Sequence, residues 1–206
     1  MKSCANSKRK NEVSMSQAPA EEPTPLMYDP FLAARTIRVF GEIDSDVAQS
    51  VFEHIYILEV LDPDEPIKLY INSPGGDVYA MFAIVDTIKS TTCPVYTIGS
   101  GQVMSAATLI LAAGTPGHRS LFPNTTLMLH EAFSAVSGKL TDVTIHHKET
   151  TRLQKLYIKL LEKYTGTAKA DLVSYILGSD YYFSPTQALK LGLADKITKK
   201  LIYLIF

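Results

Sequence analysis

Apolar residues follow two different periods along the chain, and these periods predict strands and helices in alternation. Short runs of β-branched, aromatic and aliphatic residues are typical of buried strands. Such runs occupy 36–40, 67–71, 95–99 and 126–130. Between the runs, apolar residues recur every three or four positions, which places them on one face of a helix. These helices begin at Asp44 or Ser45, near Val78 and near Met104. Strands that alternate with helices favour an α/β fold with a largely parallel sheet.

The longest periodic stretch predicts a helix from about Asp142 to Tyr164, with Gly166 as its stop. Its first half is mostly polar around 146–149, so that half has less to bury within one chain. Its second half carries an apolar stripe formed by Leu153, Leu156, Tyr157, Leu160, Leu161 and Tyr164. Further along, Ser184 as a cap and a proline in the first turn predict a last short helix.

The two ends of the chain differ from the middle in composition. Residues 1–26 are polar and too poor in apolar side chains to offset the entropy of ordering, so we expect a flexible tail or a removable propeptide. Its basic stretch at 7–10 is interpreted as part of a solvated tail. Residues 199–206 form an apolar C-terminal tail that either packs on the subunit or reaches a partner. Residues 27–198 are predicted to form one domain.

Composition excludes several classes of partner. The net charge of −1 gives no reason to expect binding to nucleic acid or to an anionic membrane. No apolar run approaches the roughly 20 residues that span a bilayer. The two cysteines, Cys4 and Cys93, lack the spacing of a disulfide scaffold, which favours a reducing, cytoplasmic compartment. We expect no metal and no cofactor, and without a GxxxxGK[ST] loop the chain is not expected to hydrolyse ATP.

Ser105 is the first candidate for chemistry. It lies in GlyGlnValMetSerAlaAlaThr, where a glycine-containing loop is predicted to lead into a helix of small residues. Backbone N–H groups at a helix start are unpaired and can hold an oxyanion beside a nucleophile. Taken alone, the segment is explained better by a structural serine packed at a helix start than by a catalytic one. The glycine pattern of the α/β-hydrolase elbow, GxSxG, is absent around Ser105, which disfavours that family.

Three further signals are weak when each is taken separately. Gly75 and Gly76 follow a predicted buried strand and permit a close approach of backbone to a ligand, although a plain turn is the better explanation of this segment when it is taken alone. His130 ends an apolar strand, where functional side chains of α/β folds collect, but a lone terminal histidine is usually structural. Asp180 precedes TyrTyrPhe in a predicted loop, where a carboxylate is usually only solvated.

In order and spacing, these segments resemble the proteolytic subunit family of Clp proteases over residues 28 to 198. The resemblance rests on IleAsnSerProGlyGly, then GlyGlnValMetSerAla, then LeuHis twenty-five residues after the serine, and then the long helix that ends in TyrThrGly. Further matching blocks are AspProAsp at 62–64, LeuAlaAlaGly at 111–114, PheProAsn at 122–124 and LeuGlyLeuAlaAsp at 191–195. The family's fold is a spiral of ββα units, shared with the crotonases, and the long helix here corresponds to its projecting handle helix.

The resemblance implies a serine peptidase with a catalytic triad. It assigns the nucleophile to Ser105, the general base to His130 and the orienting carboxylate to Asp180. The sequence carries one extra residue between Gly166 and Asp180 relative to the family, so Asp171 and Asp195 remain competitors for the carboxylate role. The resemblance further implies an oxyanion hole made by the backbone N–H groups of Gly76 and Ala106.

Several positions depart from the family pattern. Ala106 replaces the methionine that usually follows the nucleophile, which changes the adjoining substrate pocket while keeping the N–H group. Glu131 and Ala132 stand where the family has glutamine and proline, and Tyr181 stands where it has arginine. These positions help the two rings of the family communicate, so ring assembly is expected to be tuned differently here.

The resemblance also implies partners. We expect stacked heptameric rings, of this chain alone or mixed, and a hexameric AAA+ ATPase that unfolds polypeptide substrates and docks in apolar clefts. Tyr70 is a candidate cleft residue by its position. Two other readings are a non-catalytic ring subunit of the same family and a crotonase-like acyl-CoA enzyme, because fold alone does not fix function.

Overall fold

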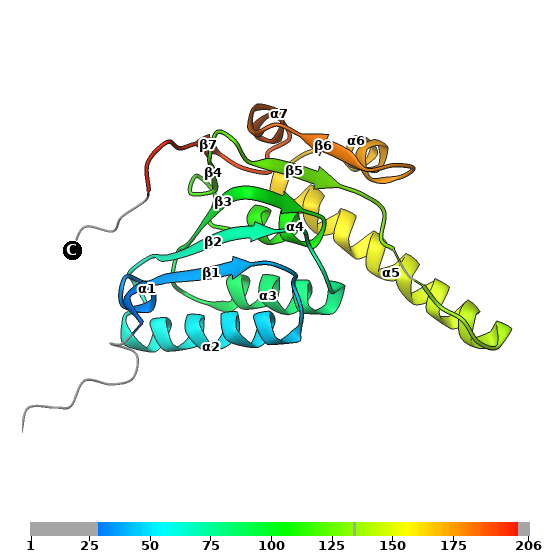
Figure 1. The fold of residues 1–206 in the computed structure, drawn as a ribbon, viewed down its shortest axis with the longest axis horizontal. Coiled ribbons are helices and arrows are strands. Elements are labelled where there is room, and N and C mark those ends of the chain that lie inside the picture. The colour runs from blue at the N-terminus through cyan, green and yellow to red at the C-terminus, as the bar shows by residue number, and fades with distance from the viewer. Residues whose placement is uncertain (1–28, 134, 202–206) are drawn as a thin grey trace, which may run out of the picture.

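A mixed sheet of seven strands forms the centre of the described part of the chain, residues 29–133 and 135–201 of the computed structural model (Figure 1). The strands are β1 (Thr36–Phe40), β2 (Ile67–Ser73), β3 (Val95–Met104), β4 (Ser120–Leu121), β5 (Thr126–Leu129), β6 (Tyr181–Phe183) and β7 (Lys196–Ile197). The helices are α1 (Pro30–Ala33), α2 (Ser45–Leu61), α3 (Val78–Ser90), α4 (Ala106–Ala112), α5 (Leu140–Thr165), α6 (Lys169–Ile176) and α7 (Pro185–Lys190).

The sheet is parallel except at one edge. β1, β2 and β3 pair in parallel, and β3 then pairs with β4 through its first half and with β5 through its second half. β7 adds to β4 in parallel, whereas β6 runs antiparallel to β5. The prediction of an α/β fold with a largely parallel sheet is therefore confirmed.

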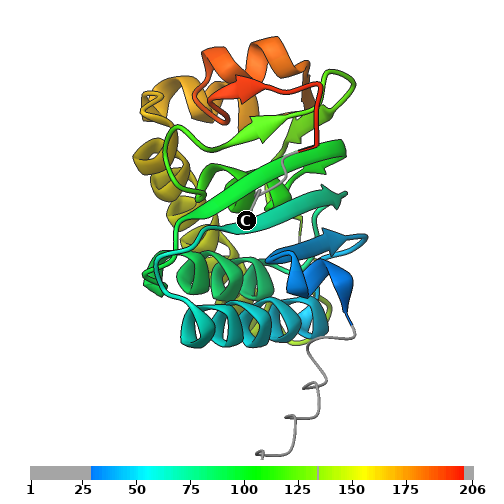
Figure 2. The same cartoon turned by 90° about the vertical axis from the view of Figure 1, so that its left-hand side faces the viewer.

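Short polar side chains fix where the helices begin. The Asp44 and Asp77 carboxylates accept hydrogen bonds from backbone N–H groups in the first turns of α2 and α3, and Ser184 forms a capping box with Gln187 at the start of α7. Gly166 ends α5 in the left-handed conformation, as its position predicts. α2 and α3 pack side by side below the sheet, as Figures 1 and 2 show.

α4 lies at the centre of the core. All of its residues are buried, which explains why it is built largely of alanine and leucine. A helix enclosed on all sides has little room for side chains, so small residues allow its neighbours to approach. Its first residue follows Ser105 directly, and the core therefore holds the candidate nucleophile in place.

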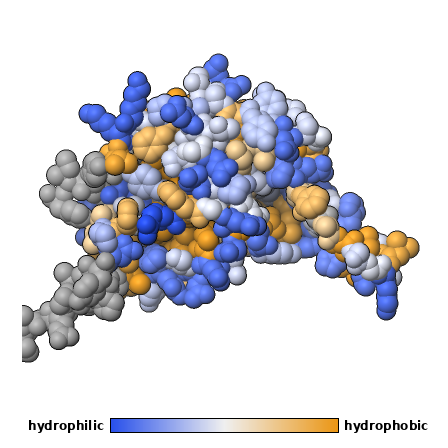
Figure 3. All heavy atoms as spheres, viewed as in Figure 1, coloured by the Kyte–Doolittle hydropathy of each residue, from blue (hydrophilic) through white to orange (hydrophobic). Residues whose placement is uncertain are grey.

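α5 is divided into a packed half and a projecting half. Its second half buries Leu153, Tyr157, Ile158 and Leu161 against the domain. Its first half extends away from the body of the molecule, and hydrophobic side chains gather at its projecting end (Figures 1 and 3). Leu140 and Ile145, both in this half, are 82% and 64% exposed. The predicted asymmetry of this helix is thus confirmed.

The structure corrects two boundaries. The third strand was expected to end at Gly99, but β3 continues to Met104 because it changes partner from β4 to β5 on the way. The segment before Ser105 is therefore strand rather than loop, and α4 begins at Ala106 rather than near Met104. The short strands β4, β6 and β7 were not expected from the sequence, since two or three residues carry no period.

The two predicted tails fall largely outside the part of the chain that the structure describes. The predicted N-terminal tail, residues 1–26, and all but the first residues of the C-terminal tail lie outside the described residues. Within 29–133 and 135–201, none of the helices combines the length and the apolar character needed to cross a membrane.

Candidate active site

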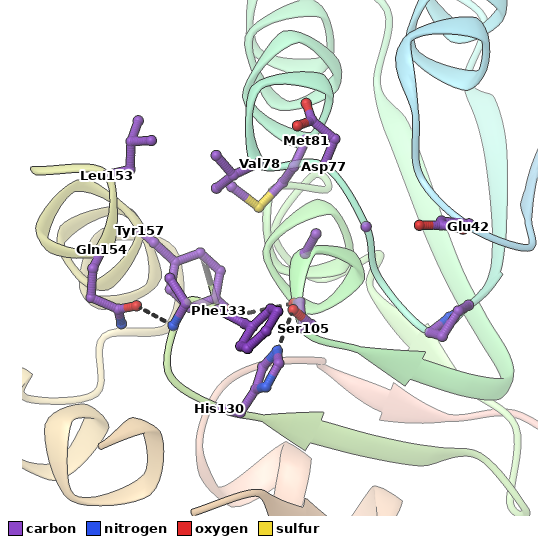
Figure 4. Close-up of a pocket in the computed structure, with 14 residues that line it drawn as sticks. Glu42, Asp77, Val78, Met81, Ser105, His130, Phe133, Leu153, Gln154 and Tyr157 are labelled. Carbon is purple, nitrogen blue, oxygen red and sulfur yellow. Dashed lines mark hydrogen bonds between the residues drawn. The ribbon is translucent and has the colours of Figure 1, made fainter. Parts of the chain in front are cut away.

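Ser105 occupies a strained turn between a strand and a helix. It follows β3 directly and has a φ of 52°, which side-chain-bearing L residues adopt rarely. Its N–H donates to the Met128 carbonyl oxygen at 2.8 Å, and its own carbonyl oxygen accepts the Thr108 N–H at 3.0 Å. Such strain persists only where surrounding contacts hold it, and it is frequent at active sites. The side chain of Ser105 faces a cavity (Figure 4).

His130 lies beside Ser105 because their two strands are neighbours. β3 and β5 are paired in parallel, with Met104 opposite Met128, so residues that follow the two strands meet at the same edge of the sheet. His130 Nε2 lies 2.8 Å from Ser105 Oγ, within hydrogen-bonding distance (Figure 4). The two residues, twenty-five positions apart in sequence, thus form the contact that a nucleophile and its general base require.

Asp180 reaches the same place through the antiparallel edge strand. β6 pairs with β5 so that Tyr181 lies opposite Leu129, which sets Asp180 beside His130. Its Oδ1 lies 3.6 Å from His130 Nδ1, and its side chain is 54% exposed. This separation is short enough for an ion pair with a protonated histidine but longer than a good hydrogen bond.

The two competing aspartates lie elsewhere. Asp195 forms an ion pair with Arg119 at 2.6 Å and also accepts the Arg119 backbone N–H at 2.9 Å. Burial alone would raise the pKa of Asp195, but the hydrogen bonds from Arg119 outweigh it and the pKa lies below its usual value. Asp171 lies in the first turn of α6 and is exposed. Of the three carboxylates, Asp180 is the one whose ion-pair contact is with His130.

The two glycines after β2 lie against Ser105 and against Ile43. A Cβ atom on Gly75, whose φ is 103°, would lie 2.7 Å from Ser105 Cβ and 2.9 Å from the Met104 carbonyl oxygen. A Cβ atom on Gly76 would overlap the Ile43 backbone. The bridge to Ile43 uses the Gly75 carbonyl and the Asp77 N–H, so the Gly76 N–H points to the other side of the chain.

Ala106 contributes its backbone rather than its side chain. As the first residue of α4, it has no carbonyl one turn earlier that could accept its N–H within the helix. Ala106 is joined to Ser105 by one peptide bond, and it lines the same cavity as Ser105 and Gly76. An N–H group in this position can stabilise negative charge that develops on a carbonyl oxygen attacked by Ser105.

The cavity in front of Ser105 has a volume of about 400 Å³ and mainly apolar walls near the serine (Figure 4). α3 supplies Val78 and Met81 to one wall, and α5 supplies Leu153 and Tyr157 to the other. A space of this size accommodates a side chain of a bound polypeptide, and an apolar lining favours an apolar one.

Sequence reasoning missed three polar side chains around this site. The hydroxyl groups of Thr108 and Tyr157 lie 2.7 Å apart, and both contact the Ser105 carbonyl oxygen, at 2.6 Å and 3.1 Å. Gln154 Oε1 accepts the N–H of Ala132 at 2.6 Å, two residues after His130, while its own Nε2 is buried without a hydrogen-bond partner in the structure. The helical period identified Tyr157 as a core residue. Its hydroxyl group was the one sequence signal of a buried hydrogen bond, because a polar group within an apolar stripe needs a partner when it is buried.

The structure also shows where the remaining residues singled out in the sequence lie. Tyr70 lies half-buried in β2, opposite Arg38 of β1 and Ile98 of β3. Glu131, Ala132 and Tyr181 flank the site, since the first two follow His130 and the third begins β6. Among the described residues, no cluster of three His, Cys, Asp or Glu side chains could hold a metal ion.

Two comparisons with known proteins identify the relatives of this chain. The family model described as Clp protease matches residues 20–201. The ATP-dependent Clp protease proteolytic subunit 2 of Treponema pallidum (strain Nichols) is 35% identical over 184 residues, which cover 89% of this chain and 92% of that protein. A contact between serine and histidine at the mouth of an apolar cavity, together with a family match over most of its length, shows that this chain belongs to the Clp protease family.

Proposed function

We propose that this chain is a catalytically competent serine endopeptidase, in which Ser105 is the nucleophile, His130 the general base and Asp180 the orienting carboxylate. The observation that carries the proposal is the 2.8 Å separation between His130 Nε2 and Ser105 Oγ at the mouth of the cavity. A serine hydroxyl is a weak nucleophile until an adjacent base accepts its proton. Membership of a protease family sets the reaction class, and this contact supplies the activation.

The reaction follows from the positions of these groups. Ser105 Oγ attacks the carbonyl carbon of the substrate peptide while His130 Nε2 takes the hydroxyl proton. The resulting oxyanion accepts hydrogen bonds from the backbone N–H groups of Gly76 and Ala106. His130 then gives its proton to the leaving amine, and a water molecule, activated by the same histidine, hydrolyses the acyl-enzyme.

Asp180 completes the triad through a small movement. Its side chain is more than half exposed, and its Oδ1 lies 3.6 Å from His130 Nδ1. A side-chain rotation that moves this oxygen by less than about 1 Å brings it into hydrogen-bonding distance. Catalytic hydrogen bonds are often long in a free enzyme and shorten when substrate binds. A charged carboxylate at Nδ1 fixes the tautomer that leaves Nε2 free to accept the serine proton.

We further propose that the subunits form stacked heptameric rings, homomeric or mixed, that enclose the active sites. The projecting half of α5 supports this, because Leu140 and Ile145 expose apolar surface that a second subunit would cover. Glu131, Ala132 and Tyr181, which flank the site, would adapt the contact between rings to this chain. An enclosed chamber admits unfolded polypeptides and excludes folded ones.

A partner must then supply unfolding. We propose a hexameric AAA+ ATPase that docks on the outside of the ring, in clefts that include Tyr70. The Treponema relative is described as ATP-dependent, which supports an ATPase partner. We place the complex in the cytoplasm, because Cys93 is a buried free thiol rather than half of a disulfide.

Labelling of the intact protein tests the proposal against its rivals. A fluorophosphonate should add one adduct per subunit, and the adduct should map to Ser105 and be absent from Ser105→Ala. An unlabelled protein that still assembles into rings would instead support the non-catalytic ring subunit. Binding of an acyl-CoA in the cavity, without labelling, would support the crotonase-like alternative.

A further inference from the structure

The peptide group between Ser105 and Ala106 connects two parts of the site. Its carbonyl oxygen belongs to Ser105 and its N–H belongs to Ala106, and in a planar trans peptide these two bonds point in opposite directions. Whatever fixes the direction of the carbonyl therefore fixes the direction of the N–H. In the proposed mechanism the Ala106 N–H faces the oxyanion. The contacts of the Ser105 carbonyl therefore control the direction of one of the two hydrogen-bond donors of the oxyanion hole.

The carbonyl side is held by the Thr108 backbone N–H, at 3.0 Å, and by two buried hydroxyl groups. Thr108 Oγ1 lies 2.6 Å from the Ser105 carbonyl oxygen, and the Tyr157 hydroxyl lies 3.1 Å from the same atom. The two hydroxyl oxygens are 2.7 Å apart. Thr108 is fully buried and Tyr157 is 7% exposed. The three oxygens form a closed triangle that joins α4 and α5 to the peptide group of the nucleophile.

A count of protons shows how the triangle works. Two hydroxyl groups bring two protons for three short oxygen contacts, and a 2.7 Å separation between hydroxyl oxygens requires a proton between them. One hydroxyl therefore donates to the other, and the second donates to the Ser105 carbonyl. In both possible directions the result is a chain of two hydrogen bonds that ends on this carbonyl. Removing either hydroxyl leaves a single hydroxyl donor for the carbonyl, because the remaining group still lies 2.6 Å (Thr108) or 3.1 Å (Tyr157) from it but is no longer polarised by its partner.

Burial keeps the chain in the donating state. It raises the pKa of the Tyr157 phenol above its ordinary value, so the hydroxyl retains its proton throughout the neutral range. A chain of hydrogen bonds polarises its members, and a carbonyl that accepts them makes the N–H of the same amide a stronger donor. The chain also opposes relaxation of Ser105 from its unfavourable φ of 52°.

We propose that Thr108 and Tyr157 are positioning residues for the oxyanion hole. Their hydroxyl chain fixes the plane of the Ser105–Ala106 peptide and strengthens the Ala106 N–H as a donor to the oxyanion. The proposal rests on the proposed nucleophilic role of Ser105 and extends it to two side chains that do not touch the substrate's reacting atoms. It predicts an effect on the transition state and not on the binding of substrate in its ground state.

The test compares Tyr157→Phe and Thr108→Val, singly and together, with the wild-type protein in its assembled form. Deleting an oxyanion donor itself costs roughly 10²–10³-fold in kcat, so loosening its support should cost less, roughly tenfold for each variant. KM for a short peptide should stay within about twofold of wild type. The affinity for a peptide boronate, whose tetrahedral adduct on serine places an oxygen in the oxyanion hole, should weaken by the same factor as kcat falls.

Three controls separate this role from general disruption. Thr108→Ser keeps the hydroxyl and should keep kcat near wild type. Tyr164→Phe makes the same change two turns further along α5 and should leave kcat and boronate affinity unchanged. The amide of the same peptide, which forms no tetrahedral adduct, should bind wild type and variants equally.

The outcomes are distinct. A loss of kcat in Tyr157→Phe and Thr108→Val that matches the loss of boronate affinity supports the proposal. A double variant that loses more than either single one supports it further, because each single variant keeps one hydroxyl within reach of the carbonyl. If wild-type activity depends on Ser105 but Tyr157→Phe and Thr108→Val leave kcat unchanged, or change only KM, this proposal alone is overturned. A wild-type protein that neither cleaves peptides nor accepts the serine label overturns the proposed function, and this inference with it.

Discussion

His130 lies 2.8 Å from Ser105 Oγ through one ring nitrogen and 3.6 Å from Asp180 Oδ1 through the other. The first separation is that of a hydrogen bond and the second is slightly longer than one. The imidazole is therefore already in contact with the Ser105 hydroxyl, while the exposed Asp180 carboxylate has room to adjust. Kinetics of variants at these three residues give the most direct test of the triad.

Ser105→Ala and His130→Ala should each reduce peptide hydrolysis by several orders of magnitude, because nucleophile and base act as a unit. The double variant should be no slower than either single one. Initial rates with a short fluorogenic peptide measure the effect, and an unchanged melting temperature and assembly state show that the fold is intact. Near-normal hydrolysis by purified Ser105→Ala would contradict the assignment of the nucleophile.

Asp180→Asn should lose about 10³–10⁴-fold in kcat, because an amide no longer fixes the tautomer of His130. Asp171→Asn is the matched control, since it makes the same change at an exposed position in α6. The same assay at several pH values checks both variants. Equal losses in the two would show that the carboxylate beside His130 has no special role.

Gly75→Ala should reduce kcat/KM by about 100-fold or more, because the new methyl group would press on Ser105 and a displacement near 1 Å is sufficient for such a loss. Gly117→Ala separates the steric clash from backbone strain. Gly117 has a similar requirement for positive φ, at 83°, but a Cβ there meets no atom within 4 Å. We expect that control to lose roughly 1 kcal/mol of stability and to keep its activity. Full activity in Gly75→Ala would contradict the close packing of this turn on the nucleophile.

Asp195→Asn should destabilise the fold without acting on the active site. The variant leaves the buried Arg119 guanidinium without its carboxylate, and because Asp195 is partly exposed the cost should be about 1–2 kcal/mol, below that of a fully buried pair. The pKa of Asp195 is lower in the folded protein than in the unfolded chain. Its contribution is therefore complete above the unfolded value and is lost as pH falls through the folded value.

Thermal unfolding at several pH values measures this effect. Wild type should lose stability more steeply than Asp195→Asn as the pH falls through about 4, where the carboxyl of the unfolded chain is about half protonated while that of the folded protein is still ionised. Parallel curves for the two proteins in that range would exclude a contribution from this ion pair.

Ile145→Asp should weaken the association of rings, because it places a charge on the exposed apolar side of the projecting half of α5. Ile145→Val keeps the surface apolar and serves as the matched control. Light scattering on the active enzyme, with peptide and folded-protein assays alongside, gives the result. Wild type should form stacked rings and degrade a folded protein only with an ATPase and ATP. A fully active monomer would contradict the proposed chamber.

The main strands and helices could be predicted because each has a clear period. The β3–α4 junction could not, since Gly99 and Gly101 resemble a stop and the strand continues only because its partner changes. The short strands β4, β6 and β7 depend on pairing with distant residues and leave no local pattern.

The candidate site shows the same division. Ser105 and His130 could be selected by their order and spacing, and the pairing of β3 with β5 explains why they meet. Among the three aspartates the resemblance favours Asp180, and the pairing of β5 with β6, which no local signal reveals, explains why this residue lies beside His130. The contact of Thr108 with Tyr157 joins residues forty-nine positions apart, and each residue looks like ordinary core when its own helix is considered.

The position of Asp180 is set by the pairing of Tyr181 with Leu129, and not by the number of residues that lead to it. The chain between the end of α5 and β6 can therefore gain or lose a residue at its exposed turn, 177–179, and the carboxylate still arrives beside the same imidazole. The one extra residue that the family resemblance implies between Gly166 and Asp180 would be an insertion of that kind. For evolution, and for protein engineering, this turn is a place where length can vary while the chemistry is conserved.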